Sequence, residues 1–167
     1  VDIIQRNARR LQNLINQLLS LSKLESGKMK LSVEEVRFDE RMKGYVQQFE
    51  SLAKQRQIDL SFTTNTSNFM VYIDKDKFDK IIYNLLSNAF KYTPSGGEIS
   101  VDIAPGGSGP DTVLITVTNT GPGIEADKLP HVFDRFYQVD ESGGNKQEGS
   151  GIGLALAKEL VELHQGE

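Results

Sequence analysis

The sequence of 167 residues contains no cysteine and only two histidines. The absence of cysteine excludes a disulfide framework and a thiolate metal site, and it permits an intracellular compartment. No apolar run approaches the ~20 residues that span a bilayer, and no signal peptide is visible. Because the chain begins with Val1 and stops at Glu167 directly after a helical pattern, we expect it to be a piece of a longer protein.

Neither sign of charge is in large excess. The formal net charge is −4, and 38% of the residues are hydrophobic while 25% are charged. This balance predicts a packed globular fold rather than a disordered chain. The slightly acidic charge argues against a nucleic-acid surface as the main role of the chain.

Residues 1–26 are predicted to form one helix that ends at Gly27. Its apolar positions recur in heptads and form a stripe wider than the seam of a two-stranded coiled coil. They are Ile4, Leu11, Leu14, Ile15, Leu18, Leu19 and Leu21. Packing on the helix's own domain is one interpretation. Because no other apolar helix close in sequence covers this stripe, we favour a bundle formed with a second copy.

The rest of the chain alternates between strand and helix patterns. Helices are expected at about 40–56 (capped by Asp39), from Asp74 or Asp76 to 91, near 129–136, and at 152–164, and strands at 58–63, 71–73, 98–103 and 113–118. Residues 29–36 suggest an edge strand or an extended linker. Turn residues cluster at 65–68, 94–97 and 104–111, and the glycine-rich segment 140–150 resembles a mobile lid. The predicted fold class is α+β, a two-layer sandwich with helices on one face of a mixed sheet and an appended N-terminal helix.

Two amides and an ammonium group share one face of the third predicted helix. Asn84, Asn88 and Lys91 stand at positions i, i+4 and i+7. An amide oxygen can join the octahedral shell of Mg²⁺, and a lysine can meet phosphate charge. The alternative is an ordinary solvent face that happens to carry Asn and Lys.

A glycine-rich turn follows the strand at 113–118 and runs from Asn119 through Gly121 and Gly123 to Ile124. Glycine permits positive φ and a close approach of the backbone to a flat ring. Taken alone, the pattern is more typical of a turn with no ligand, because Asn and Gly are the commonest turn residues.

Two further motifs follow. Phe133 and Phe136 stand three residues apart, and a Gly-x-Gly-x-Gly pattern from Gly149 to Gly153 precedes an apolar helix. Backbone N–H groups at a helix N-terminus form an anion site. A P-loop is excluded because no Lys-Ser/Thr follows the glycines, and the dinucleotide fingerprint fails because no first βαβ unit with an acidic partner surrounds them.

In this order, the four motifs resemble the N, G1, F and G2 boxes of the ATP-binding domain of sensor histidine kinases, which has the Bergerat or GHKL fold. The resemblance implies ATP and Mg²⁺ as cofactors, Asn88 as the metal ligand, and Lys91 and Tyr92 facing the nucleotide. The other ATP-binding residues that it implies are Asn84, Asn119, Gly121, Gly123, Ile124, Phe133, Phe136, Gly149, Ser150, Gly151, Ile152, Gly153 and Leu154. The segment 132–140 resembles hybrid two-component sensors in particular.

The chain departs from the family pattern at two positions. Asn119 replaces the usual Asp that accepts a hydrogen bond from the adenine amino group, and Gln138 stands where many relatives have an Arg that reaches the γ-phosphate. Arg135 or Lys146 are candidates to substitute for that Arg. Asn84 stands where hydrolytic relatives have a Glu. Because an amide cannot act as a general base, hydrolysis of ATP by water is not expected.

The phosphoacceptor is also missing. Neither His131 nor His164 lies in a phosphoacceptor context, so both are interpreted as structural. No catalytic residue is therefore assigned in this chain, and the fragment is not expected to phosphorylate itself. The resemblance divides the chain into 1–27 as the second helix of a dimerisation hairpin, 28–36 as linker and first strand, and 37–167 as an ATP-binding domain without its last two strands.

The implied partners are ATP, a second copy, a phosphoacceptor helix and a response regulator receiver domain, with no nucleic acid. The implied location is the cytoplasmic part of a membrane-bound sensor. Two alternatives remain: a pseudokinase-like binding module weakened by Asn119, and another ATPase of the same fold.

Overall fold

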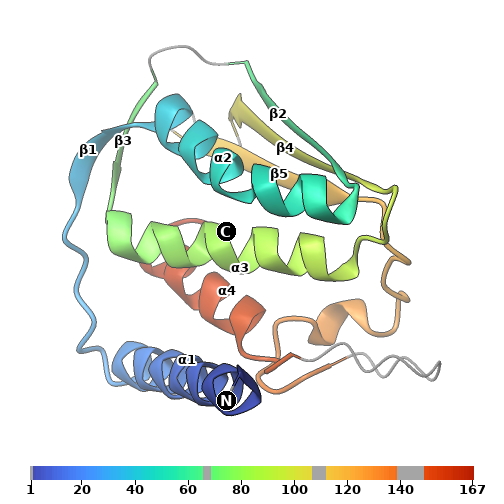
Figure 1. The fold of residues 1–167 in the computed structure, drawn as a ribbon. Coiled ribbons are helices and arrows are strands. Elements are labelled where there is room, and N and C mark those ends of the chain that lie inside the picture. The colour runs from blue at the N-terminus through green and yellow to red at the C-terminus, as the bar shows by residue number, and fades with distance from the viewer. Residues whose placement is uncertain (1, 66–68, 107–111, 139–148) are drawn as a thin grey trace. The chain divides into compact units, whose positions relative to one another are not determined.

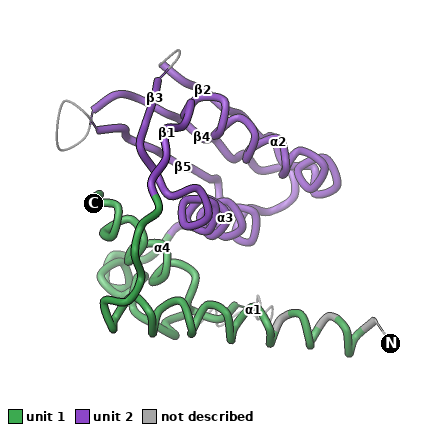
Figure 2. The backbone as a smooth tube through the Cα atoms, turned by 90° about the vertical axis from the view of Figure 1, so that its left-hand side faces the viewer, with its two compact units in different colours: residues 1–32, 124–167 green, residues 33–123 purple. Residues whose placement is uncertain are grey.

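A computed structural model describes the chain except for residues 1, 66–68, 107–111 and 139–148. The described chain forms two compact units, residues 33–123 and residues 1–32 with 124–167 (Figure 2). The elements in chain order are α1 (Asp2–Glu25), β1 (Glu34–Arg37), α2 (Phe38–Arg56), β2 (Asp59–Thr64), β3 (Met70–Ile73), α3 (Lys75–Tyr92), β4 (Glu98–Pro105), β5 (Val113–Asn119), a 3₁₀ turn (Leu129–His131) and α4 (Gly153–Leu163) (Figure 1).

The unit of residues 33–123 is built on a mixed sheet. Strand β4 pairs in parallel with β2 and antiparallel with β5, and β1 pairs separately with β3 in an antiparallel ladder. Helices α2 and α3 lie over one face of the three-stranded sheet (Figure 1). The predicted α+β sandwich, with helices on one face of a mixed sheet, is confirmed.

Strict alternation along β4 separates the two faces of this sheet. Ile99, Val101 and Ile103 are at most 1% exposed, whereas the intervening side chains are polar and more exposed. Because successive strand residues point to opposite faces, the apolar set packs toward the helices. From α3 and α2 the fully buried side chains Phe38, Met42, Ile82, Leu86 and Phe90 complete this core.

Of the two helix starts predicted in this unit, one is confirmed and one is wrong. Either Asp74 or Asp76 was expected to begin α3. The structure selects Asp74, whose Oδ1 accepts a hydrogen bond from the Lys77 backbone N–H at 3.1 Å. The expected Asp39 cap is wrong. Helix α2 begins at Phe38, whose side chain is 1% exposed and whose N–H donates to Phe69 O, so burial and this bond start the helix before Asp39.

Other boundaries differ by a few residues from the sequence expectations. Strand β1 occupies only Glu34–Arg37, at the end of the segment 29–36, and the helix expected near 129–136 is reduced to the 3₁₀ turn. The expected lid at 140–150 and the turns at 65–68 and 104–111 fall largely outside the described residues.

In the other unit, α1 packs against α4, and Leu21 is its one buried residue among those whose side chains are described. Gly27 ends α1 as predicted. Its φ is +63°, its N–H donates to Leu24 O, and the Lys28 N–H donates to Lys23 O, which is a Schellman arrangement.

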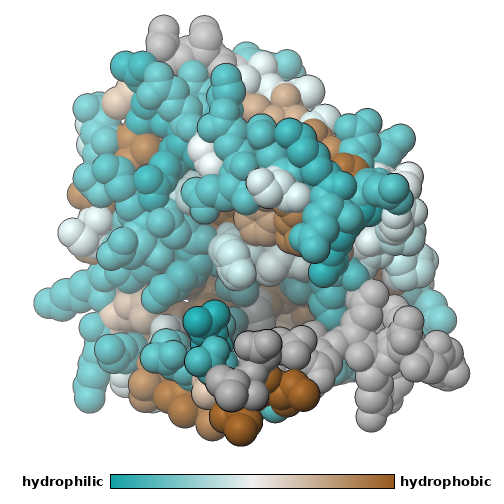
Figure 3. Space-filling view, viewed as in Figure 1, coloured by the Kyte–Doolittle hydropathy of each residue, from teal (hydrophilic) through white to brown (hydrophobic). Residues whose placement is uncertain are grey.

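Most of the α1 stripe is exposed to solvent, and Leu14 is half-buried. The exposed large apolar side chains of α1 are Ile3, Ile4, Leu11, Ile15, Leu18 and Leu19. Figure 3 shows hydrophobic residues gathered where α1 lies in Figure 1. A contiguous apolar stripe of this kind is typical of an interaction surface. Within the described ranges, none of the helices combines the length and the apolarity that a membrane crossing requires.

Candidate functional site

Along helix α3, the polar residues of the first motif differ in their exposure to solvent. Asn84 is 9% exposed, and its Nδ2 donates to Lys80 O at 2.8 Å. Asn88 and Lys91 are half-buried. The Lys91 Nζ donates to the Tyr92 hydroxyl at 2.8 Å and lies 4.5 Å from the centre of that ring. The helix therefore places Asn88 and Lys91 within reach of solvent and a ligand, and keeps Asn84 closer to the core.

The second motif meets the end of α3. Asn119 is the last residue of β5 and is exposed, and Gly121 follows two residues later. A Cβ atom on Gly121 would lie 2.6 Å from the Tyr92 carbonyl oxygen and 2.7 Å from the Asn119 Nδ2. No side chain fits at such distances, so position 121 requires glycine. This contact brings the first two motifs together within one unit.

The third and fourth motifs meet backbone to backbone in the other unit. Phe136 has a φ of 64° and Gly151 a φ of 66°, and the Phe136 N–H donates to Gly151 O at 2.9 Å. A Cβ atom on Gly151 would lie 2.6 Å from the Phe136 carbonyl carbon and 2.8 Å from Tyr137 O. Glycine at 151 is therefore required by both its conformation and its neighbours. Phe133, Phe136 and Ile124 are exposed.

The fourth motif leads directly into the N-terminus of α4. Ile152 is 1% exposed and precedes Gly153, the first helical residue, and Leu154 is half-buried. The Ser150 Oγ accepts a hydrogen bond from the Ile152 N–H at 3.2 Å. The other N–H groups of this first turn have no partner within the helix, so the turn can bind an anion such as a phosphate.

Each unit carries groups of a kind that bind nucleotides. In the unit of residues 33–123 these are the amide of Asn88 and the ammonium group of Lys91, and in the other unit the start of α4 offers N–H donors for phosphate oxygens. In the part of the chain that the structure describes, no group of three or more His, Cys, Asp or Glu side chains could hold a metal ion. The amide oxygen of Asn88 could provide one ligand of a Mg²⁺ ion, which prefers oxygen ligands and keeps several waters.

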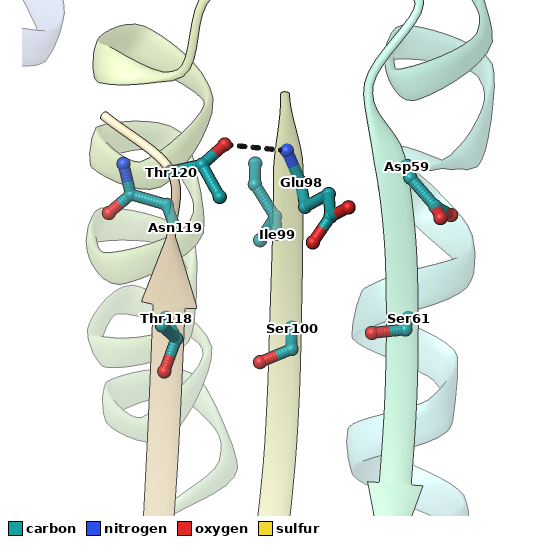
Figure 4. A pocket seen from close by; sticks show the side chains of 8 residues that line it. All are labelled: Asp59, Ser61, Glu98, Ile99, Ser100, Thr118, Asn119 and Thr120. Atoms are coloured by element: carbon teal, nitrogen blue, oxygen red, sulfur yellow. Dashed lines mark hydrogen bonds between the residues drawn. The ribbon is translucent and has the colours of Figure 1, made fainter. Parts of the chain in front are cut away.

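A shallow hollow of about 100 Å³ lies on the open face of the sheet, away from α2 and α3 (Figure 4). It is lined by Asp59, Ser61, Glu98, Ile99, Ser100, Thr118, Asn119 and Thr120. Figure 4 shows the Asn119 amide on the side of β5 away from β4, so this amide points away from the other side chains of the hollow. The hollow was not predicted, although the polar alternation along β4 marks this face.

Comparisons with known proteins decide the family. Residues 73–167, more than half of the chain, match the family of histidine kinase-, DNA gyrase B- and HSP90-like ATPases. The chain belongs to this ATPase family. The resemblance predicted from the four motifs is thus confirmed.

The relatives of this ATPase domain include sensor kinases. Hybrid signal transduction histidine kinase D of Dictyostelium discoideum is 41% identical over 99% of this chain and 11% of its own length. Sensor histidine kinase TmoS of Ectopseudomonas mendocina is 38% identical over 99% of this chain and 17% of its own length. The chain therefore spans less than a fifth of either relative. The mycobacterial sensor histidine kinase MprB has a solved structure with a TM-score of 0.63 and 28% identity, covering 80% of each chain.

Two sets of polar contacts in the unit of residues 1–32 and 124–167 were missed by the sequence analysis. The Ser150 Oγ donates to the Gln17 Oε1 of α1 at 3.3 Å, and Arg135 forms ion pairs with Glu25 of α1 and Glu159 of α4. Glu25 and Arg135 are 110 residues apart, so no local periodicity could have revealed this pair.

Proposed function

We propose that this chain binds Mg-ATP as the catalytic part of a sensor histidine kinase. The γ-phosphate would pass to a histidine on a dimerisation helix outside the chain, and from there to a response regulator receiver domain. The observation that carries the proposal is the pairing of the motifs, with Gly121 against Tyr92 in one unit and Gly151 against Phe136 in the other. Membership of the ATPase family supports the same ligand.

Each polar group has a proposed role. Asn88 holds Mg²⁺, which when bound neutralises phosphate charge, while Lys91 and Tyr92 face the nucleotide. Asn119 accepts a hydrogen bond from the adenine amino group, and the backbone from Gly149 to Gly153 binds phosphate. Positioning and charge stabilisation by these groups are the main contributions that a protein makes to phosphoryl transfer.

The two histidines of the chain are engaged in local contacts, which supports an acceptor outside it. The His131 Nδ1 lies 2.7 Å from the Asp134 Oδ2, and the His164 Nδ1 lies 2.7 Å from Leu160 O at the end of α4. Neither stands on a long exposed helix. We therefore propose that this chain supplies the ATP-binding half of the reaction and another helix supplies the acceptor.

The exposed stripe of α1 supports assembly of two copies. Apolar side chains such as Leu11 and Leu18 are 58% and 43% exposed, and burying them against a second copy is favourable. We propose that residues 1–27 form the second helix of a dimerisation hairpin and that residues 37–167 form the ATP-binding domain after a linker at 28–36. A cytoplasmic location in a membrane-bound sensor follows from this proposal.

Asn119 favours a second candidate, a pseudokinase-like module that relays conformation with weak nucleotide binding. A neutral hydrogen bond contributes about 0.5–1.5 kcal/mol net, against about 1.5–3 kcal/mol with a charged partner. Replacing the family carboxylate with an amide therefore weakens nucleotide binding by roughly tenfold. Weakened rather than abolished binding is expected.

Thermal unfolding with and without Mg-ATP tests both candidates. Because a ligand that binds only the native state stabilises it by about 2.7 kcal/mol at a hundredfold excess over Kd, the midpoint should rise by roughly 5–10 °C for a chain of this size. The Asn119→Asp variant should show a larger rise at the same nucleotide concentration. Asn13→Asp, the same chemical change on an exposed position of α1, is the matched control and should respond like the unmodified chain.

The outcomes separate the two candidates. A rise in the unmodified chain supports the kinase proposal, and a rise only in Asn119→Asp supports the pseudokinase-like module. Cooperative unfolding with no rise in either protein would contradict nucleotide binding by this chain.

A further inference from the structure

Arg135 joins three segments of the unit formed by residues 1–32 and 124–167. Its Nη1 pairs with the Glu25 Oε1 at the end of α1, and its Nη2 pairs with the Glu159 Oε1 of α4 at 3.2 Å. The hydrogen bond that Arg135 donates to Glu25 raises the pKa of Arg135, so the guanidinium stays charged. A planar guanidinium can donate to two carboxylates at once, which an ammonium group does less well.

The next residue along the chain is strained. Phe136 has a φ of 64°, a conformation that costs a residue with a Cβ atom appreciable free energy. Such residues persist only where their surroundings over-determine them. Two contacts restrain Phe136. Its N–H donates a hydrogen bond to Gly151 O, and the residue before it, Arg135, is held by ion pairs to two carboxylates.

We propose that Arg135 is a positioning residue of the nucleotide site: its ion pairs with Glu25 and Glu159 hold Phe136 against Gly151 and thereby fix the phosphate-binding turn. This inference rests on the proposed function. It differs from the role suggested by sequence, in which Arg135 replaces the missing Arg at position 138 and contacts the γ-phosphate directly. The paired guanidinium, 36% exposed, favours the positioning role.

The two roles predict opposite effects of removing the carboxylates. If Arg135 acts by positioning, loss of Glu25 and Glu159 loosens the turn and weakens nucleotide binding. If Arg135 acts as a phosphate ligand, the carboxylates compete for it, and their loss strengthens binding. Neither glutamate belongs to the proposed ATP-binding residues, so their substitution reports on Arg135.

The experiment compares Mg-ATP affinity by calorimetry in the unmodified chain, Glu25→Gln/Glu159→Gln and Arg135→Ala. Exposed ion pairs are individually weak, so we expect both variants to bind about threefold to tenfold more weakly. Arg135→Lys, which keeps the charge, should lie between Arg135→Ala and the unmodified chain. The control Glu50→Gln/Glu167→Gln makes the same charge change at exposed positions and should match the unmodified chain. Tighter or unchanged binding in Glu25→Gln/Glu159→Gln would overturn the proposal.

A second measurement does not need nucleotide. Amide hydrogen exchange at Phe136, Gly151 and Ile152 should be faster in Glu25→Gln/Glu159→Gln than in the control, while exchange in α3 stays unchanged. If the unmodified chain fails to bind Mg-ATP, the proposed function fails, yet this exchange still tests the positioning role. Equal exchange in the two variants would overturn it.

Discussion

Replacing Gly151 with alanine is expected to remove most Mg-ATP binding and to destabilise the fold by about 2–4 kcal/mol. The added Cβ would stand 2.6 Å from the Phe136 carbonyl carbon and 2.8 Å from Tyr137 O, both backbone atoms, and the φ of +66° is itself unfavourable for alanine. The backbone must therefore shift where the third and fourth motifs meet. Urea unfolding measures the stability, and calorimetry measures the loss of affinity, which should exceed tenfold.

Gly44→Ala is the matched control for this change. Gly44 lies within α2, has ordinary φ, and nothing lies within 4 Å of an added Cβ atom. Because glycine inside a helix costs roughly 0.5–1 kcal/mol relative to alanine, this variant should be more stable than the unmodified chain and bind Mg-ATP equally well. Normal stability and affinity in Gly151→Ala would contradict the close packing of the two motifs.

Leu86→Ala should cause the second large effect, a loss of about 3–4 kcal/mol in the free energy of unfolding. The Leu86 side chain is 0% exposed and lies on the inner side of α3. Removing it leaves a cavity that the surrounding core cannot fill completely. Because α3 also carries Asn88 and Lys91, we expect the nucleotide affinity to fall as well, and chemical denaturation with a binding titration measures both.

Leu114→Ala makes the same substitution on the open face of the sheet. Leu114 is 52% exposed on β5, so its truncation should cost well under the roughly 2–5 kcal/mol typical of buried leucines. Equal losses in the two variants would show that the core does not lie between α3 and the sheet.

The predictable part of the fold came from periodicity. The alternation of apolar residues in β4 and the heptad spacing in α1 are patterns between residues close in sequence, so both can be recognised from the sequence alone. The start of α3 was predictable to within two residues, as Asp74 or Asp76, since a capping side chain bonds three residues away; the structure selects Asp74. The start of α2 was not, because the buried Phe38 and its bond to Phe69 are tertiary contacts.

The candidate site was predictable as a list of residues but not as a geometry. The motifs identified Gly121 and Gly151, and the structure shows why each must be glycine. The helical face of Asn84, Asn88 and Lys91 was predicted as one polar stripe, whereas Asn84 is buried and its amide is bonded to Lys80 O within the helix. The bridge from Arg135 to α1 and α4 could not be predicted, because its partners are distant in sequence.

Backbone amide chemical shifts recorded during a titration with Mg-ATP test the proposed nucleotide site, because they locate the ligand residue by residue. Binding as proposed should shift amides at 84–92, 119–124, 133–137 and 149–154, with little change at Asp59 and Ser61 on the open face of the sheet. Shifts confined to that open face, or no shifts at a saturating concentration, would contradict the assignment of this chain as an ATP-binding kinase domain.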